Sequence, residues 1–153
     1  MDQQIEIKAI QIDALLNQLH TVAEQQREIL FSKTQSTITN TQGHILMLLN
    51  QKGLQTNKEL AEALQISPAA ITKAMKGLQK DDCNCVVPVI DQKDARLVRF
   101  TVNQQGAALA EIHAEQHAET LAVYDAIIQQ FSASEQQVIS RFITELGHCL
   151  KEE

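Results

Sequence analysis

Apolar residues recur along most of this chain at the three- and four-residue intervals of amphipathic helices. Over residues 5–31 they predict one long helix, and a polar break follows it. The next helix, with Asn40 or Thr41 as its N-cap, contains an apolar run over residues 45–49 that is too dense for a surface helix. We therefore expect this second helix to be buried and to end at Gly53.

Residues 60–78 are interrupted once, at Ser67-Pro68, and each side has the pattern of a helix. Thr56 and Glu59 match a capping box, and Ser67 can cap a helix whose first position, Pro68, needs no N–H partner. The apolar positions turn inward, which leaves a polar and basic outer face made of Thr72, Lys73, Lys76 and Gln79. This is the pattern of a helix-turn-helix. Two capped helices packed by chance would look similar but would rarely leave so uniform a polar face.

Two β-rich stretches, residues 83–90 and 97–102, are joined by a charged segment and predict a hairpin, or wing. A long helix is expected over residues 104–130, and a last helix starts at the capping pattern of Ser132 and Glu135. The first helix and the last two have more apolar surface than one small lobe can cover. We expect a mainly α fold with a small β-wing: a winged helix-turn-helix lobe over 40–103, and a dimerisation region over 1–39 and 104–153.

The composition fits one folded unit with a sizeable core and a mostly helical structure, because the 153 residues include only two prolines and five glycines. No apolar stretch approaches membrane-spanning length, and no basic segment followed by an apolar run starts the chain. We therefore expect a soluble, cytoplasmic protein. Cys83, Cys85 and Cys149 are odd in number and lack the zinc-ribbon spacing, so a disulfide framework is not expected.

The charge is unevenly distributed along the chain. The net charge of −6 argues against indiscriminate binding to nucleic acid. Residues 67–99, however, contain six basic and four acidic side chains, a local charge of +2, so the remainder carries −8. A small positive face on an acidic body suits a protein that docks on DNA in one orientation.

The order of these elements, with Asp94-Ala95-Arg96 at the predicted wing tip, resembles the MarR family of winged-helix regulators over nearly the whole chain. Residues 40–49, 67–74 and 93–96 are similar to the zinc-uptake repressors of that family, the AdcR and ZitR group. The resemblance implies a homodimer on a palindromic operator, with the second helix of the motif in the major groove and Arg96, steadied by Asp94, in the minor groove. The DNA-contacting residues that it implies are Ser67, Pro68, Ala69, Ala70, Thr72, Lys73, Lys76, Lys93, Asp94 and Arg96.

His113 and His117 are four residues apart and therefore share one face of the predicted long helix, the face that also carries Tyr124, Ile128 and Phe131. A lone histidine there would more often be a hydrogen-bonded core residue. A buried pair is harder to explain, because repulsion disfavours charging both rings and each ring needs a partner. Metal ligation would serve both. The residues alone leave the remaining ligands open among His20, Glu24, Glu28, His44 and His148.

The family resemblance narrows this choice. In the zinc-uptake repressors the principal site matches Glu28, His44, His113 and His117 of this chain. Three nitrogens and a carboxylate suit Zn²⁺, although they also suit other borderline divalent ions. The family's second site, a cysteine and two glutamates, matches Thr34, Gly43 and Ile112 here. None of these is a good ligand, so we expect the second site to be absent or rebuilt.

Two other functions compete with that of a metal-responsive repressor of zinc-uptake genes. The segment His113–His117 resembles the H-E-x-x-H zinc hydrolases only superficially, because its glutamate is third, and a four-ligand site leaves no position for substrate. An enzyme is therefore disfavoured. The closer rival is a MarR-type repressor released by a small organic ligand or by oxidation, with structural histidines. Cys83 and Cys85 have no third soft ligand in view, and we expect them to be structural or incidental to redox chemistry.

Overall fold

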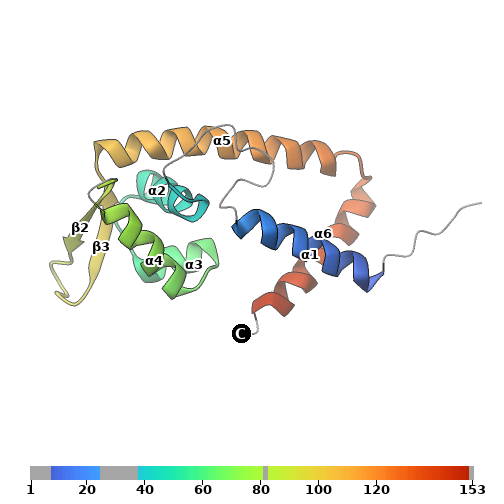
Figure 1. Ribbon diagram of the computed structural model, residues 1–153, viewed down its shortest axis with the longest axis horizontal. Coiled ribbons are helices and arrows are strands. Elements are labelled where there is room, and N and C mark those ends of the chain that lie inside the picture. Colours follow the sequence, from blue (N-terminus) through green and yellow to red (C-terminus); the bar gives the residue numbers. More distant parts are fainter. Residues whose placement is uncertain (1–7, 25–37, 81–82, 152–153) are drawn as a thin grey trace, which may run out of the picture. The chain divides into compact units, whose positions relative to one another are not determined.

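The computed structural model describes residues 8–24, 38–80 and 83–151 (Figure 1). Its elements, in chain order, are α1 (Ala9–Glu24), α2 (Asn40–Lys52), β1 (Gln55–Thr56), α3 (Asn57–Leu64), α4 (Pro68–Gln79), β2 (Val86–Ile90), β3 (Val98–Val102), α5 (Gln104–Ile128) and α6 (Ala133–Lys151). The expected order of helices, helix-turn-helix and wing is confirmed. The chain divides inside α5 into two compact units, residues 1–117 and 118–153. The boundaries predicted for the DNA-binding lobe and the dimerisation region remain a prediction.

The start of the second helix differs from expectation, whereas the first helix is described only in part. Helix α1 spans Ala9–Glu24, and residues 5–7 and 25–31 of the predicted helix lie outside the described part. The N-cap of α2 is Thr39, so the prediction of Asn40 or Thr41 was wrong. The Thr39 hydroxyl accepts from the Gln42 N–H at 3.2 Å, and the Gln42 side chain accepts from the Thr39 N–H at 2.9 Å. Thr-x-x-Gln is a capping box, which the sequence contains one residue earlier than expected. Gly53 ends the helix at φ 78°, as predicted.

The predicted helix-turn-helix is confirmed as α3 and α4. Thr56 and Glu59 form the capping box of α3, while the Ser67 hydroxyl accepts from the Ala70 N–H at 3.2 Å and starts α4. Between them Gln65 takes the left-handed conformation at φ 56°, which ends α3. The two helices pack on α2 around a core of fully buried apolar side chains that includes Ile45, Leu46, Leu49, Leu60, Ile71 and Leu78. This core fixes which face of α4 stays outside.

The wing is an antiparallel hairpin of β2 and β3, with β1 added at the other edge of β3. The hairpin was predicted, but β1 was not, because two residues are too short to show an alternating pattern. Strand β2 starts at Val86 rather than at residue 83, since the preceding residues form a turn with Asn84 at φ 46°. Unit 1 is thus a small helical lobe with a three-stranded sheet.

The turn before β2 contains a single local disulfide between Cys83 and Cys85, which was not predicted from the sequence. Their Cα atoms are 5.3 Å apart, inside the range that a disulfide spans, because the left-handed Asn84 folds the chain back. Counting cysteines cannot reveal such a turn. Cys149 is a free, exposed thiol.

The second unit consists of the end of α5 and helix α6. Ser132 and Glu135 form the predicted capping box, with the Glu135 carboxylate accepting from the Ser132 N–H at 2.7 Å. Several large apolar side chains of α6 are exposed in the single chain: Val138, Phe142, Ile143 and Leu150. Such a surface is what a dimerisation helix needs. Among the described residues, none of the helices has the length and apolar character required to cross a membrane.

Candidate functional site

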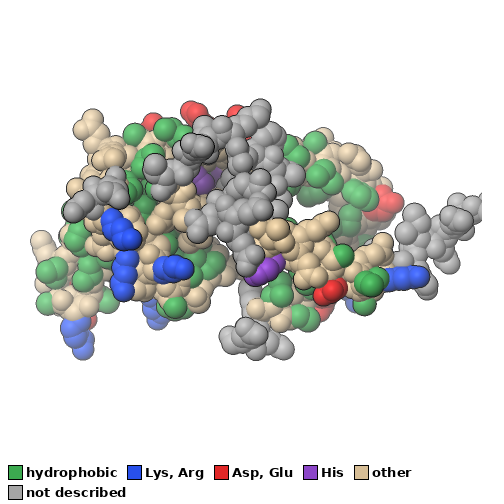
Figure 2. Space-filling view, in the orientation of Figure 1, with side chains coloured by type: hydrophobic (Ala, Val, Ile, Leu, Met, Phe, Trp, Pro, Cys, Tyr) green, Lys and Arg blue, Asp and Glu red, His purple; other side chains and the backbone are tan. Residues whose placement is uncertain are grey.

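One face of α4 is exposed and carries the residues predicted to contact DNA. Ser67, Pro68, Ala69, Thr72, Lys73 and Lys76 are exposed and Ala70 is half-buried. On the opposite side Ile71, Met75 and Leu78 are almost completely buried. Lys and Arg side chains gather over α4 and the β2–β3 hairpin (Figure 2). The sequence pattern therefore placed these side chains on the correct face, although their contact with DNA stays a prediction.

At the wing tip the Arg96 side chain is exposed to solvent and is held in place by Asp94. The Arg96 side chain is 90% exposed, yet its Nε and Nη2 atoms donate to the two carboxylate oxygens of Asp94 at 3.1 and 3.2 Å. The Arg96 N–H donates to the same carboxylate at 3.0 Å. These hydrogen bonds from Arg96 hold the pKa of Asp94 below its usual value. The steadying contact implied by the family resemblance is therefore present, while Lys93 beside it is exposed.

Arg99 ties the base of the wing to the helix-turn-helix, and sequence reasoning missed it. Its guanidinium donates to Glu59 at 3.1 Å and to Asp91 at 3.2 Å. The pKa of Glu59 is lowered first by the Thr56 N–H and then by Arg99, and that of Asp91 first by the Lys93 N–H and then by Arg99. Glu59 therefore caps α3 and holds the sheet at once. No spacing reveals the pair, because its members are 40 positions apart.

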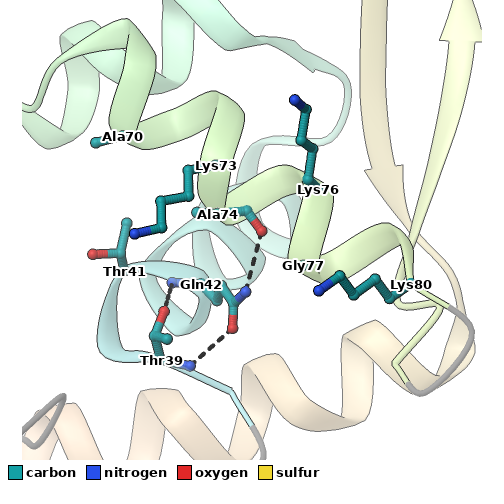
Figure 3. A pocket seen from close by; sticks show the side chains of 9 residues that line it. All are labelled: Thr39, Thr41, Gln42, Ala70, Lys73, Ala74, Lys76, Gly77 and Lys80. Atoms are coloured by element: carbon teal, nitrogen blue, oxygen red, sulfur yellow. Dashed lines mark hydrogen bonds between the residues drawn. The ribbon is translucent and has the colours of Figure 1, made fainter.

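A second link joins α2 to α4. The Gln42 side-chain amide donates to the Ala74 carbonyl at 3.2 Å, while its oxygen completes the cap of α2 (Figure 3). A Cβ atom at Gly77 would lie 2.2 Å from the Gln42 amide nitrogen, so a larger residue there would displace the amide from its present position. The Gln42 side chain thus connects α4 to the N-terminus of α2 by hydrogen bonds.

Three of the four predicted metal ligands lie close together. His44 comes from α2, and His113 and His117 come from α5. The ring centroid of His44 is 5.2 Å from that of His113 and 4.9 Å from that of His117. His44 Nε2 and His117 Nδ1 are 3.5 Å apart. Two nitrogen ligands of one tetrahedral Zn²⁺ are separated by about 3.3–3.5 Å, since each Zn–N bond is about 2.0–2.1 Å.

His113 reaches this cluster because α2 has no side chain in its way. A Cβ atom at Gly43 would lie 2.4 Å from two atoms of the His113 ring, so the imidazole packs directly on the backbone of α2. The ring is 7% exposed. Burial, and after it the neighbouring His44 and His117, lower the pKa of His113 to about 4. The imidazole is therefore neutral at pH 7, the form in which it binds a metal.

The structure describes only some of the other residues predicted for the two metal sites. Glu28, the fourth predicted ligand, and Thr34 lie outside the described residues. Within the residues that are described, no group of three or more His, Cys, Asp or Glu side chains is already arranged to hold a metal ion. The donor chemistry of the cluster nevertheless fits zinc. Two positions that match the family's second site are described. The His113 ring occupies the space that a side chain at Gly43 would need, and Ile112 is 52% exposed.

A winged helix-turn-helix followed by long helices defines a class of transcription regulators, and the MarR family model matches residues 38–83. The transcriptional regulator AdcR of Streptococcus pyogenes serotype M6 is 44% identical over 135 residues, which are 87% of this chain and 90% of AdcR. The chain therefore belongs to the MarR family. These regulators are not enzymes, which confirms the prediction against catalysis.

Solved structures agree with this assignment. Lactococcus lactis ZitR in complex with DNA has a TM-score of 0.74 and 36% identity, covering 94% of this chain and 98% of that one. A crystal structure described as a zinc-responsive MarR family member, again Lactococcus lactis ZitR, has a TM-score of 0.70 and 35% identity over 92% and 96% of the two chains. The predicted resemblance to the AdcR and ZitR group is confirmed.

Proposed function

We propose that this chain is a homodimeric, cytoplasmic repressor that binds a palindromic operator of zinc-uptake genes when loaded with zinc. The observation that carries the proposal is the convergence of His44, His113 and His117 beside a winged helix-turn-helix. Relatives that are named as transcriptional regulators, one of them described as zinc-responsive and one bound to DNA, support it.

The metal would be held by the three histidines together with Glu28. Zn²⁺ supplies a dipositive charge that neutral imidazoles and a carboxylate bind strongly without redox chemistry. Because His113 is already neutral at pH 7, zinc would not have to displace a proton from this ring. The second metal site of the family is absent in this proposal, because the position of Gly43 is needed by His113.

The coupling between metal and DNA follows from which helices provide the ligands. His44 lies two residues after Gln42, whose amide is bonded to the Ala74 carbonyl of α4. A ligand shell that joins α2 to α5 restricts α2, and the restriction passes through this hydrogen bond and the shared core to α4. Zinc then favours one orientation of the DNA-binding lobe, which is a coupling free energy between two sites.

DNA docking uses the exposed face of α4 and the wing. The face from Ser67 to Lys76 fits the major groove, which admits one helix. Arg96, held by Asp94, would enter the minor groove, where a narrow groove concentrates negative potential. Dimerisation through residues 1–39 and 104–153 would give two such readers on a two-fold axis.

The experiment that tests the function starts from DNA that the protein chooses. The zinc-loaded, tag-free protein is used to select duplexes from a random library, and the affinity for the selected duplex is measured with zinc, manganese, iron and a chelator. We expect a palindromic sequence bound at least tenfold more tightly with zinc than with chelator. Selection of no palindrome, or equal affinity with and without zinc, would overturn the proposal.

A further inference from the structure

A pocket of about 560 Å³ opens between the start of α2 and the exposed side of α4 (Figure 3). Its rim carries three lysines of the α4 segment, Lys73, Lys76 and Lys80, and two threonines at the start of α2, Thr39 and Thr41. The three lysines are exposed and the threonines are half-buried. Hydrogen-bond donors and positive charge thus stand around the rim, while most of the inner lining is apolar.

Within the described residues these lysines form no ion pair with a carboxylate, and Asp81 and Asp82, which follow Lys80 in the chain, lie outside that part. The ion pairs of the described residues join Arg96 to Asp94 and Arg99 to Glu59 and Asp91, and none involves the three lysines. The positive end of the α2 dipole adds to the same field. Ala70 and Gly77, two small residues of α4, line the pocket without filling it. These features suit a tetrahedral oxyanion.

We propose that this pocket binds one backbone phosphate of the operator and thereby clamps α2 to α4 on the DNA. DNA is the source of the phosphate because the pocket continues the exposed face of α4 that the proposed function places in the major groove, on which this inference rests. Figure 3 shows Lys73 pointing toward Thr41, whereas Lys76 points away from Gln42. Lys73 and Lys80 therefore bind the phosphate, and Lys76 is left for the groove.

The clamp has a consequence for regulation. Its two walls are the helices that the Gln42–Ala74 hydrogen bond joins, so the phosphate binds well only when α2 and α4 are correctly placed. A phosphate contact positions the protein but reads no sequence. The pocket therefore contributes to affinity and to the response to zinc, and not to the choice of operator.

Salt dependence measures the contact directly. Each phosphate contact makes the slope of log K against log salt more negative by about 0.9. A variant that lacks one contact should therefore lose about 3.5-fold less affinity than wild type when the salt is raised from 50 to 200 mM. We expect this reduction for Lys80→Gln and for Lys73→Gln in the zinc-loaded protein, with an unchanged preference for operator over scrambled duplex. The matched control is Lys52→Gln, an exposed lysine about 18 Å away at the other end of α2.

A second measurement identifies the phosphate. A set of operator duplexes, each with one neutral methylphosphonate, is bound to wild type and to Lys80→Gln. The loss of affinity that each methylphosphonate causes in the two proteins is compared as a double-mutant cycle. We expect one position per half-site where the methylphosphonate lowers the affinity of wild type at least threefold and leaves the affinity of Lys80→Gln almost unchanged. Circular dichroism of each variant verifies that the fold is retained.

The outcomes separate the two proposals. If wild type shows no zinc-dependent operator binding, the proposed function fails and the clamp fails with it. If wild type binds normally but Lys80→Gln and Lys73→Gln keep its salt slope, and no methylphosphonate position couples to Lys80, the clamp alone is overturned. A reduced slope with one coupled phosphate supports it.

Discussion

The imidazole of His113 is neutral because it is buried beside two other histidines, and this makes the metal-free protein sensitive to acid. Its folded pKa of about 4 lies below the ordinary value of 6.5, so the unfolded chain binds more protons between these values. We expect the melting temperature of chelator-treated protein to be constant above pH 6.5 and to fall as the pH drops toward 4. His113→Asn should weaken this dependence, while His148→Asn, at an exposed site, should keep it. A pH-independent melting temperature would contradict this account.

Gly43 decides whether His113 can reach the cluster. A methyl group there would meet the ring at 2.4 Å, and overpacking of this kind costs about 1–3 kcal/mol. Gly43→Ala should therefore lower both the stability and the zinc affinity, measured by thermal unfolding and by chelator competition. The control is Gly147→Ala in α6, where a Cβ meets nothing within 4 Å and the gain in helix propensity is about 0.5–1 kcal/mol. Equal effects of the two changes would refute the close-packing argument.

At the scale of single residues the sequence was informative wherever one helix contains the whole signal. The capping residues Thr56 and Ser67 and the shared face of His113 and His117 were predicted, because their partners lie three or four positions away. Contacts between distant segments were not, as Arg99 shows. The pairing of His44 with the two later histidines came only from the family resemblance, and Glu28 stays a prediction because it lies outside the described residues.

The wing is an element whose tip is exposed and whose base is anchored, so its arginine can be removed without disturbing the fold. Arg96→Ala should weaken operator binding at least tenfold, because a minor-groove guanidinium is lost, while zinc affinity stays unchanged. Gel shifts and chelator competition measure the two quantities. Arg141→Ala, an exposed arginine of α6, serves as the control. Normal operator affinity in the Arg96 variant would remove the wing from the proposed interface.

The turn between α4 and β2 is closed by a disulfide of only three residues, Cys83 to Cys85. So short a loop loses little chain entropy, and the stabilisation is about 1.5 kcal/mol by loop length. Reduction, or the double change Cys83→Ala and Cys85→Ala, should lower the melting temperature slightly and leave zinc-dependent operator binding intact. The double variant should no longer respond to reductant. Loss of operator binding on reduction of wild type alone would instead favour the rival regulator controlled by oxidation.

At the scale of elements, length determined what could be predicted. The two hairpin strands and the helices from α2 onward were found because each repeats its pattern over several residues. Strand β1 pairs Gln55 with Phe100 and Thr56 with Arg99, and nothing in its own two residues indicates this. The start of β2 was placed too early because the cysteine turn has β-like composition. A left-handed Asn84 depends on the fold around it and has no pattern of its own.

At the scale of the whole molecule, the exposed apolar side chains of α6 and the basic side chains of α4 and the wing belong to different units, although unit 1 also exposes apolar side chains such as Ile10 and Ile90. The apolar residues of α6 belong to residues 118–153, whereas the lysines of α4 and the wing arginine belong to residues 1–117. A dimer that covers the apolar surface leaves two basic faces for DNA on an otherwise acidic protein, consistent with the net charge of −6. In the proposed mechanism zinc acts on the DNA-binding lobe through His44, the one ligand that α2 contributes.

His44 is the proposed ligand that α2 contributes, and it therefore decides whether zinc controls the lobe or merely binds near it. His44→Ala leaves His113, His117 and Glu28 to hold a metal more weakly. The variant loses the direct bond between metal and α2, and a ligand that does not discriminate between two conformations cannot shift their populations, however much of it is bound. We expect the His44 variant, saturated with zinc and verified by metal analysis, to bind operator as weakly as metal-free wild type.

The matched control for this experiment is His148→Ala, which changes an exposed histidine of α6 and should keep the full response to zinc. The measurement is operator affinity at a free zinc concentration that loads both variants equally. If the loaded His44 variant binds as tightly as loaded wild type, the metal does not act through α2. The contacts at the start of α5, where Asn103 donates to the carbonyl of Asn84 and Gly106 packs against Cys85, would then be the next route to test.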